Sequence, residues 1–239
     1  MKQFTRWLIA ISAVLLPFSA IADVTEYTLV IDREPINITG KTVERITING
    51  GIPGPILEFT EGDEAVIHVI NKLDEPTSVH WHGLLLPPEM DGVPGLGGYE
   101  AIKAGETFTY RFTLRQNGTY WYHAHSGTQE QDGHYGVIYP KDEPVVQADR
   151  DYVVLLSDFS NEIGQQIFNN LKKSPHYYNY SQRTVGDFFS EVRKQGLASA
   201  WQDVRPWGEM RMSPTDLADV RYDAFLVNGQ TNEQNWTGL

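Results

Sequence analysis

Two short histidine couplets carry the residues of this sequence with the clearest capacity for chemistry. One is His80-Trp81-His82 and the other, further along the chain, is His123-Ala124-His125. In an extended strand, residues i and i+2 point to the same face, and their roots stand about 6.6 Å apart. That spacing is wide for one ion held by both rings, but it suits two neighbouring ions. Because imidazole binds copper, zinc, iron and nickel, two couplets on adjacent strands predict a polynuclear transition-metal site.

The alternative is that these histidines are structural, because one isolated His-x-His couplet is a weak signal. Four of the seven histidines nevertheless fall in two short windows that are rich in aromatic residues and flanked by glycine. We therefore interpret the two couplets as metal ligands. His68 and His176 are interpreted as structural, and no role is assigned to His134.

The elements around the couplets are expected to be short strands. Residues 107–114 alternate four apolar side chains with three threonines and an arginine, which predicts a half-buried strand. Gly62-Asp63 and Asn117-Gly118 are expected to form hairpin turns. Eight or nine short strands at regular spacing predict a β-sandwich or barrel. The other strands are expected over 24–31, 36–39, 42–49, 56–59, 64–71, 77–83, 119–125 and 135–139.

The second part of the sequence has a different character. A charged linker with two prolines, residues 140–149, precedes the apolar run Tyr152–Leu156, which predicts a buried strand. Helices are expected over 162–173 and 187–201, with Thr184 as the N-cap of the latter and Asp187 as its partner. Residues 221–228 return to a strand pattern. One or two strands cannot close a β-domain, so we expect a second domain that is only begun here.

The motifs around the couplets resemble one known family. They are His80-Trp81-His82-Gly83, Tyr122–Gly127, Pro87–Gly95, Asn117–Gln131, Thr215–Val220 and Asn228-Gly229-Gln230. Together they resemble the N-terminal portion of multicopper oxidases of the copper-resistance branch, the periplasmic copper oxidases. The resemblance implies an all-β fold: a cupredoxin-like Greek-key β-sandwich over residues 23–145, then an incomplete second cupredoxin-like domain with a helical insertion over 146–239.

The resemblance also implies roles for individual residues. His80 would bind the type 2 copper, His82 and His123 one copper of the type 3 pair, and His125 the other. Four further histidines of the trinuclear cluster would come from a C-terminal domain that this sequence lacks. Asp91 would help to deliver protons during dioxygen reduction, although an Asp-Gly turn residue is an equal alternative. The neighbouring residues are assigned by type: Gln129, Glu130 and Gln131 are candidates for orienting imidazoles, and Trp81, Trp121 and Tyr122 are expected in the core.

The sequence contains no cysteine. A blue type 1 copper site needs a cysteine thiolate, so this chain cannot build the site through which multicopper oxidases take up electrons. We expect the complete protein to oxidise a small reductant, such as cuprous ion or a phenol, and to reduce dioxygen to water. The 239-residue chain alone is expected to be inactive. The alternative is a periplasmic copper-binding module without catalysis.

The first 22 residues are predicted to be a signal peptide. Lys2 and Arg6 form a positive segment, Leu8–Phe18 is apolar, and Ala20-Ile21-Ala22 has the pattern of a cleavage site. The apolar run is too short for a membrane anchor, which needs about 20 residues. Because there is no Arg-Arg pair, we expect Sec-type export to the periplasm, with no membrane span after cleavage. The formal net charge of −12 argues against nucleic acid as a partner.

Overall fold

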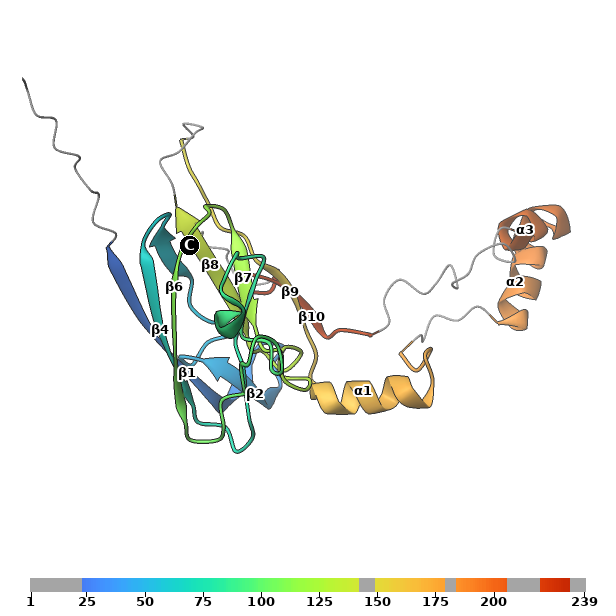
Figure 1. Cartoon of the computed structure of the whole chain (residues 1–239). Coiled ribbons are helices and arrows are strands. Elements are labelled where there is room, and N and C mark those ends of the chain that lie inside the picture. The colour runs from blue at the N-terminus through green and yellow to red at the C-terminus, as the bar shows by residue number, and fades with distance from the viewer. Residues whose placement is uncertain (1–22, 142–148, 179–183, 206–219, 233–239) are drawn as a thin grey trace, which may run out of the picture.

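The computed structural model describes residues 23–141, 149–178, 184–205 and 220–232. Two four-stranded sheets lie face to face (Figure 1). The first has the strand order β2-β1-β4-β6 and the second has the order β3-β8-β7-β5. β1 is parallel to β4 and β3 is parallel to β8, and the other neighbours are antiparallel. The strands are β1 (Val24–Asn37), β2 (Thr42–Ile48), β3 (Leu57–Thr60), β4 (Glu64–Asn71), β5 (His80–His82), β6 (Thr107–Thr113), β7 (Tyr120–His123) and β8 (Tyr135–Lys141).

The core lies between the two sheets. β6 shows the predicted alternation, since Tyr110 and Phe112 are buried while the threonines and Arg111 point outward. Burial of such apolar side chains supplies roughly 1.5–3 kcal/mol each and dominates the stability of the sandwich. The fully buried side chains include Leu29, Ile31, Ile46, Ile48, Leu57, Ile67, Trp81, Tyr110, Tyr122 and Ile138.

β1 is longer than the sequence pattern predicts. The two strands expected over 24–31 and 36–39 form one continuous strand, Val24–Asn37. Pro35 lies within it, although proline cannot donate a ladder hydrogen bond. The reason is that β1 pairs with β4 only as far as Ile31, whereas its remaining residues pair with β2 alone. On the side away from β2, Pro35 has no paired strand, so the N–H that proline lacks is not needed there for a ladder hydrogen bond.

Both predicted hairpins are wrong. Gly62-Asp63 joins β3 to β4, and Asn117-Gly118 joins β6 to β7, and in each case the two strands belong to different sheets. The chain does reverse at Gly62, where the Asp63 amide donates to the Thr60 carbonyl at 3.1 Å. Turn residues determine that the chain reverses, but the packing of the sandwich determines which strands pair.

The second part of the chain contains β9 (Leu156–Phe159) and β10 (Ala224–Val227), which pair antiparallel. β9 lies beside β8, where the Tyr135 hydroxyl donates to Ser157 Oγ at 2.9 Å. The prediction of a buried strand over Tyr152–Leu156 is wrong. The strand begins only at Leu156, which is 72% exposed, and Val154 is 51% exposed. Apolar composition alone does not bury a strand. Among the described residues, nothing packs over the outer face of this one.

Three helices follow β9 in the described residues: α1 (Gly164–Lys173), α2 (Val185–Gln195) and α3 (Leu197–Val204). The single helix expected over 187–201 is two helices, because Gly196 has a φ of +86° and ends α2. Thr184 caps α2 as predicted, with Asp187 closing the capping box. A short 3-10 helix, η1 (Pro88–Met90), lies in the loop after β5.

Three assignments from the sequence lie wholly or mostly outside the described residues: the signal peptide over 1–22, the linker over 140–149 and the motif Thr215–Val220. Among the helices that are described, none combines the length and the apolar character needed to cross a membrane.

Candidate metal centre

The two histidine couplets lie on adjacent antiparallel strands, β5 and β7. His80 pairs with His123, and His82 pairs with Trp121. Because side chains alternate along a strand, this register places the imidazoles on one face. Trp81 and Tyr122, which pair with each other, point to the other face and are buried in the core, as predicted.

Trp121 does not pack in the core, and that prediction is wrong. It shares the face of the histidines, because it precedes His123 by two residues. Its ring stacks on the His123 imidazole with a centroid distance of 4.0 Å and an interplanar angle of 15°. Trp121 is therefore a wall of the site.

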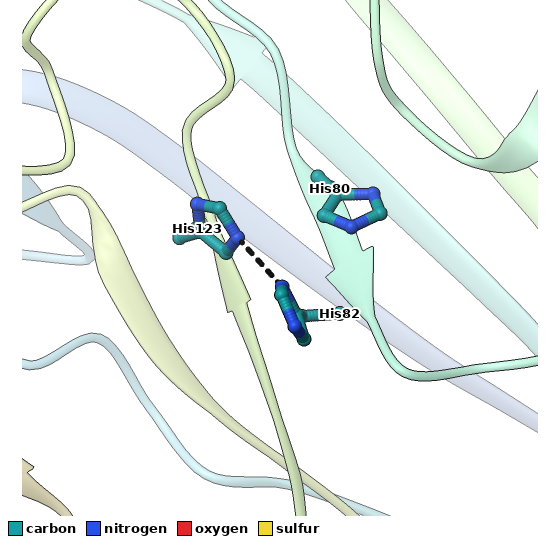
Figure 2. Close-up of side chains that lie close together, drawn as sticks. All are labelled: His80, His82 and His123. Carbon is teal, nitrogen blue, oxygen red and sulfur yellow. Dashed lines mark hydrogen bonds between the residues drawn. The ribbon is translucent and has the colours of Figure 1, made fainter.

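Three of the four predicted ligands converge. One nitrogen each from His80, His82 and His123 lies within 4.8 Å of the others. Figure 2 shows the three rings facing a common space, two from β5 and one from β7. Two nitrogens bound to one ion at about 2.0–2.1 Å stand at most roughly 4.2 Å apart. Small side-chain rotations would thus let these imidazoles hold copper, and the donor set fits the metal.

His125 lies just past the end of β7. Its ring centroid is 5.6 Å from that of His80 and 6.0 Å from that of His123. Its backbone amide donates to Ser78 Oγ at 3.1 Å, and Ser78 is also hydrogen-bonded to Ser126 at 2.8 Å. The fourth predicted ligand is therefore held beside the other three but does not belong to the converging group.

Asp91 contacts His80 in two ways. The Nδ1–H of His80 donates to the Asp91 carbonyl at 2.8 Å, and Asp91 Oδ2 lies 3.4 Å from the same nitrogen. These contacts place the proton on Nδ1 and leave Nε2 without a proton, as a metal ligand would require. Burial lowers the pKa of His80, although the Asp91 carbonyl and carboxylate oppose this effect. The imidazole is thereby favoured in the neutral form that a metal requires.

The close approach of the Asp91 loop to β5 depends on Gly92. Its φ is +80°, and a Cβ atom at this position would lie 1.7 Å from the Val79 carbonyl oxygen. Only glycine has no Cβ and also adopts this conformation readily. The Asp-Gly pair therefore serves as a turn, and it also carries Asp91 to the imidazole of His80.

His123 is oriented by the loop that follows it. Its Nδ1–H faces Glu130 Oε2 at 2.7 Å and the Ala124 carbonyl at 3.0 Å. Its Nε2 therefore carries no proton and can accept a hydrogen bond. The Nδ1–H of His82 donates to it at 3.3 Å. Of the three residues expected to orient imidazoles, only Glu130 contacts one among the described hydrogen bonds and ion pairs. Gln129 is bonded to Thr77 and Pro76, and Gln131 to Asp158.

A buried polar group that the sequence did not indicate lies behind the loop. Thr77 Oγ1 donates to Gln129 Oε1 at 2.7 Å and lies 3.3 Å from His134 Nδ1. The His134 carbonyl accepts from the Ala124 amide at 3.0 Å, between the two histidines of the second couplet. Complete burial lowers the pKa of His134 to about 3. The one sequence signal that could have drawn attention to His134 is its position shortly after His125.

His68 lies away from this site. It is on the outward face of β4, where its ring nitrogens contact Thr109 Oγ1 at 2.8 Å and Glu26 Oε1 at 2.9 Å. These two contacts agree with the structural role predicted for it.

Comparison with known proteins gives consistent matches. Residues 30–144 match the family model described as multicopper oxidase. The chain is 48% identical over 232 residues to copper resistance protein A of Escherichia coli, an alignment that covers 95% of this chain and 38% of that protein. It is 47% identical over 227 residues to copper resistance protein A of Pseudomonas syringae pv. tomato, covering 93% of this chain and 37% of that one.

The solved structures agree on the fold. The laccase from Botrytis aclada matches with a TM-score of 0.56 at 36% identity, over 62% of this chain and 28% of that chain. The likeness supports the predicted cupredoxin-like fold. The chain spans little more than a third of the length of the curated relatives named above, 38% and 37%.

Proposed function

Because this chain belongs to the multicopper oxidase family, we propose that its two histidine couplets are its share of a trinuclear copper cluster that reduces dioxygen to water. The observation that supports this most directly is the convergence of ligand nitrogens from His80, His82 and His123 within 4.8 Å. These residues come from two strands, so the ladder between β5 and β7 holds the ligands in place before any metal binds. Copper, when bound, supplies the electron-transfer chemistry of dioxygen reduction.

The assignment of ligands follows the family pattern. His80 would bind the type 2 copper, and His82 and His123 would share one copper of the type 3 pair. His125 would bind the other type 3 copper. Its ring lies beside the other three, with its centroid 5.6 Å from that of His80 and 6.0 Å from that of His123.

Asp91 is proposed to deliver protons to the site. Its carboxylate lies 3.4 Å from His80 Nδ1, and its side chain is 22% exposed. It therefore contacts the imidazole of His80 while remaining partly open to solvent. A carboxylate in that place can take a proton from water and pass it inward.

The activity of the complete protein is also part of the proposal. The 239 residues contain no cysteine, so a type 1 copper would need a thiolate from polypeptide outside them. By the family pattern, four further histidine ligands would also come from outside them. The complete oxidase would act in copper resistance, in the periplasm after Sec-type export, on a small reductant such as cuprous ion or a phenol. Residues 23–145 would form its first cupredoxin-like Greek-key domain, and residues 146–239 would begin the second.

A copper-binding module without catalysis is the second candidate. The same convergence of His80, His82 and His123 also fits it, because three imidazoles of this chain alone could hold a single ion. The two functions predict different copper contents. A simple binding module needs one ion per chain, whereas the proposed share of a cluster holds ligands for more than one.

Copper titration of the full 239-residue chain tests the proposal. We expect more than one equivalent of copper to bind, a pale colour without a strong blue band, and a loss of affinity of at least tenfold in each of His80→Ala, His82→Ala and His123→Ala. His68→Ala is the matched control and should bind like wild type. Unchanged binding in the couplet variants would refute the site, and a single equivalent per chain would favour the binding module.

A further inference from the structure

We propose that Glu130 is a positioning residue for His123, holding the proton of this imidazole on Nδ1 so that Nε2 faces the metal. The inference deepens the proposed function and depends on it for its purpose. Its structural basis is the 2.7 Å contact between Glu130 Oε2 and His123 Nδ1.

The contact is short, as expected for a hydrogen bond from an imidazole N–H to a carboxylate. A carboxylate accepts only, so the shared proton belongs to the ring nitrogen. The Ala124 carbonyl, 3.0 Å from the same nitrogen, is a second acceptor and favours the same tautomer. Imidazoles that bind metals commonly donate their other N–H to a carboxylate or carbonyl, which fixes both the tautomer and the ring orientation.

The backbone on both sides of Glu130 is fixed. Gln129 is buried and bonded to Thr77 and Pro76. Asp132 Oδ1 accepts from the Gly164 amide at the start of α1, at 2.7 Å. The Glu130 carbonyl itself accepts from the Gly133 amide at 3.1 Å. Although the Glu130 side chain is 49% exposed, it therefore extends from an anchored loop toward the imidazole.

Trp121 and Glu130 constrain His123 in complementary ways. Trp121 stacks on the plane of the ring, at 4.0 Å between centroids, and this limits tilting. Glu130 and Ala124 hold the Nδ1 edge, and this limits rotation within that plane. With both constraints, Nε2 is directed toward His82, 3.3 Å away, and toward the space shared with His80.

The surroundings of Glu130 offer a matched control. A pocket of about 540 Å³ is lined by Glu130, Trp121 and Asp158, among others. Asp158 is a second carboxylate of this pocket, where it accepts hydrogen bonds from Gln131 and Tyr222 and has no described contact with an imidazole. Replacing it changes the charge of the same pocket without touching His123.

The test compares Glu130→Ala, Glu130→Gln and Asp158→Asn in the full chain. Outer partners of metal-bound histidines typically contribute about 10–100-fold in affinity. Because the Ala124 carbonyl remains, we expect Glu130→Ala to weaken copper binding about tenfold, at the low end of that range. Glutamine keeps an oxygen acceptor, so Glu130→Gln should stay within about threefold of wild type, as should Asp158→Asn.

A second readout uses no metal. Nitrogen-15 NMR of the histidine rings in the metal-free chain should show the Nδ1–H tautomer for His123 in wild type and Glu130→Gln. Glu130→Ala should show an increased Nε2–H fraction. Wild-type affinity and tautomer in Glu130→Ala would overturn the inference, and so would an equal loss of affinity in Asp158→Asn. If wild type itself fails to bind copper, the proposed function fails, whereas the tautomer comparison still decides the role of Glu130.

Discussion

His80 on β5 and His123 on β7 are direct register partners, with ring centroids 5.4 Å apart and planes nearly perpendicular at 89°. This pairing decides which side chains form the candidate site. A slip of the register by one residue would exchange the two faces of β7 relative to β5. Tyr122 would then stand on the metal side, and the imidazoles of the second couplet would enter the core.

Gly92→Ala is expected to unfold or strongly destabilise the chain. The new Cβ would lie 1.7 Å from the Val79 carbonyl oxygen, and the φ of +80° is unfavourable for alanine. We expect a loss of more than about 3 kcal/mol in the free energy of unfolding, measured by urea denaturation. Gly95→Ala is the control, since it has a similar φ of +87° but nothing within 4 Å of the new atom. It should lose only about 1–2 kcal/mol, and equal losses would contradict the steric explanation.

Thr77→Val tests the buried hydrogen-bond network behind the candidate ligands. Thr77 is fully buried, and its hydroxyl donates to Gln129 Oε1 at 2.7 Å. Valine would leave that oxygen without its donor, at a cost of about 1–3 kcal/mol. Thr77→Ser keeps the hydroxyl and should cost only about 1 kcal/mol for the lost methyl group. Thermal unfolding of the metal-free chain measures both, and a serine variant as unstable as the valine variant would disprove the role of the hydroxyl.

His134 should make the metal-free chain acid-sensitive. Burial lowers its pKa to about 3, below the ordinary value of 6.5, so the unfolded chain binds this proton more readily than the folded chain. The stability contributed by its neutral form is complete above pH 6.5 and is lost as the pH falls toward 3. Between pH 7 and pH 5 the expected loss is about 2 kcal/mol.

The matching variant is His134→Asn, which has no titrating group in this range. Its free energy of unfolding should fall by about 2 kcal/mol less than that of wild type between pH 7 and pH 5. Chemical denaturation at the two pH values gives the comparison. Identical pH dependence in the two proteins would mean that another group carries the effect.

Arg45→Met should loosen the segment that carries α1. Arg45 is 1% exposed, and its guanidinium donates to the carbonyls of Ser160 at 2.5 Å and Glu162 at 3.0 Å. Methionine would fill the space but leave both carbonyls without these donors, so hydrogen exchange in α1 should accelerate at least tenfold relative to β4. Arg33→Ala is the control, because Arg33 makes an exposed ion pair with Glu75 at 3.0 Å, worth at most about 1 kcal/mol. Unchanged exchange in Arg45→Met would show that α1 is held by other contacts.

The strands were largely predictable because each carries its own pattern. The alternation in residues 107–114 matches β6, and Thr184 with Asp187 caps α2 as expected. Pairing was not predictable, since Asn117-Gly118 has good hairpin chemistry and yet joins strands of different sheets. The solvent exposure of Leu156 also could not be predicted from the sequence, because burial depends on what packs over a strand.

The candidate site also has features that could be predicted from the sequence and features that could not. The residue types and the i, i+2 spacing predict that His80 and His82 share a face, and the absence of cysteine excludes a blue copper site in this chain. Neither feature indicates which ring nitrogen of His80 or His123 carries the proton. That choice depends on Asp91 and Glu130, which reach their imidazoles from loops.

The sequence by itself thus determined the chemistry available to this protein: four imidazoles in two i, i+2 couplets, without a thiolate. These properties are local, because each follows from residue type and from the periodicity of a single strand. Only the tertiary structure decided that His80 stands opposite His123 and that Glu130 contacts His123. Each of these relationships joins residues through the pairing of β5 with β7 or the path of a loop, and such contacts form only when distant parts of the chain pack together.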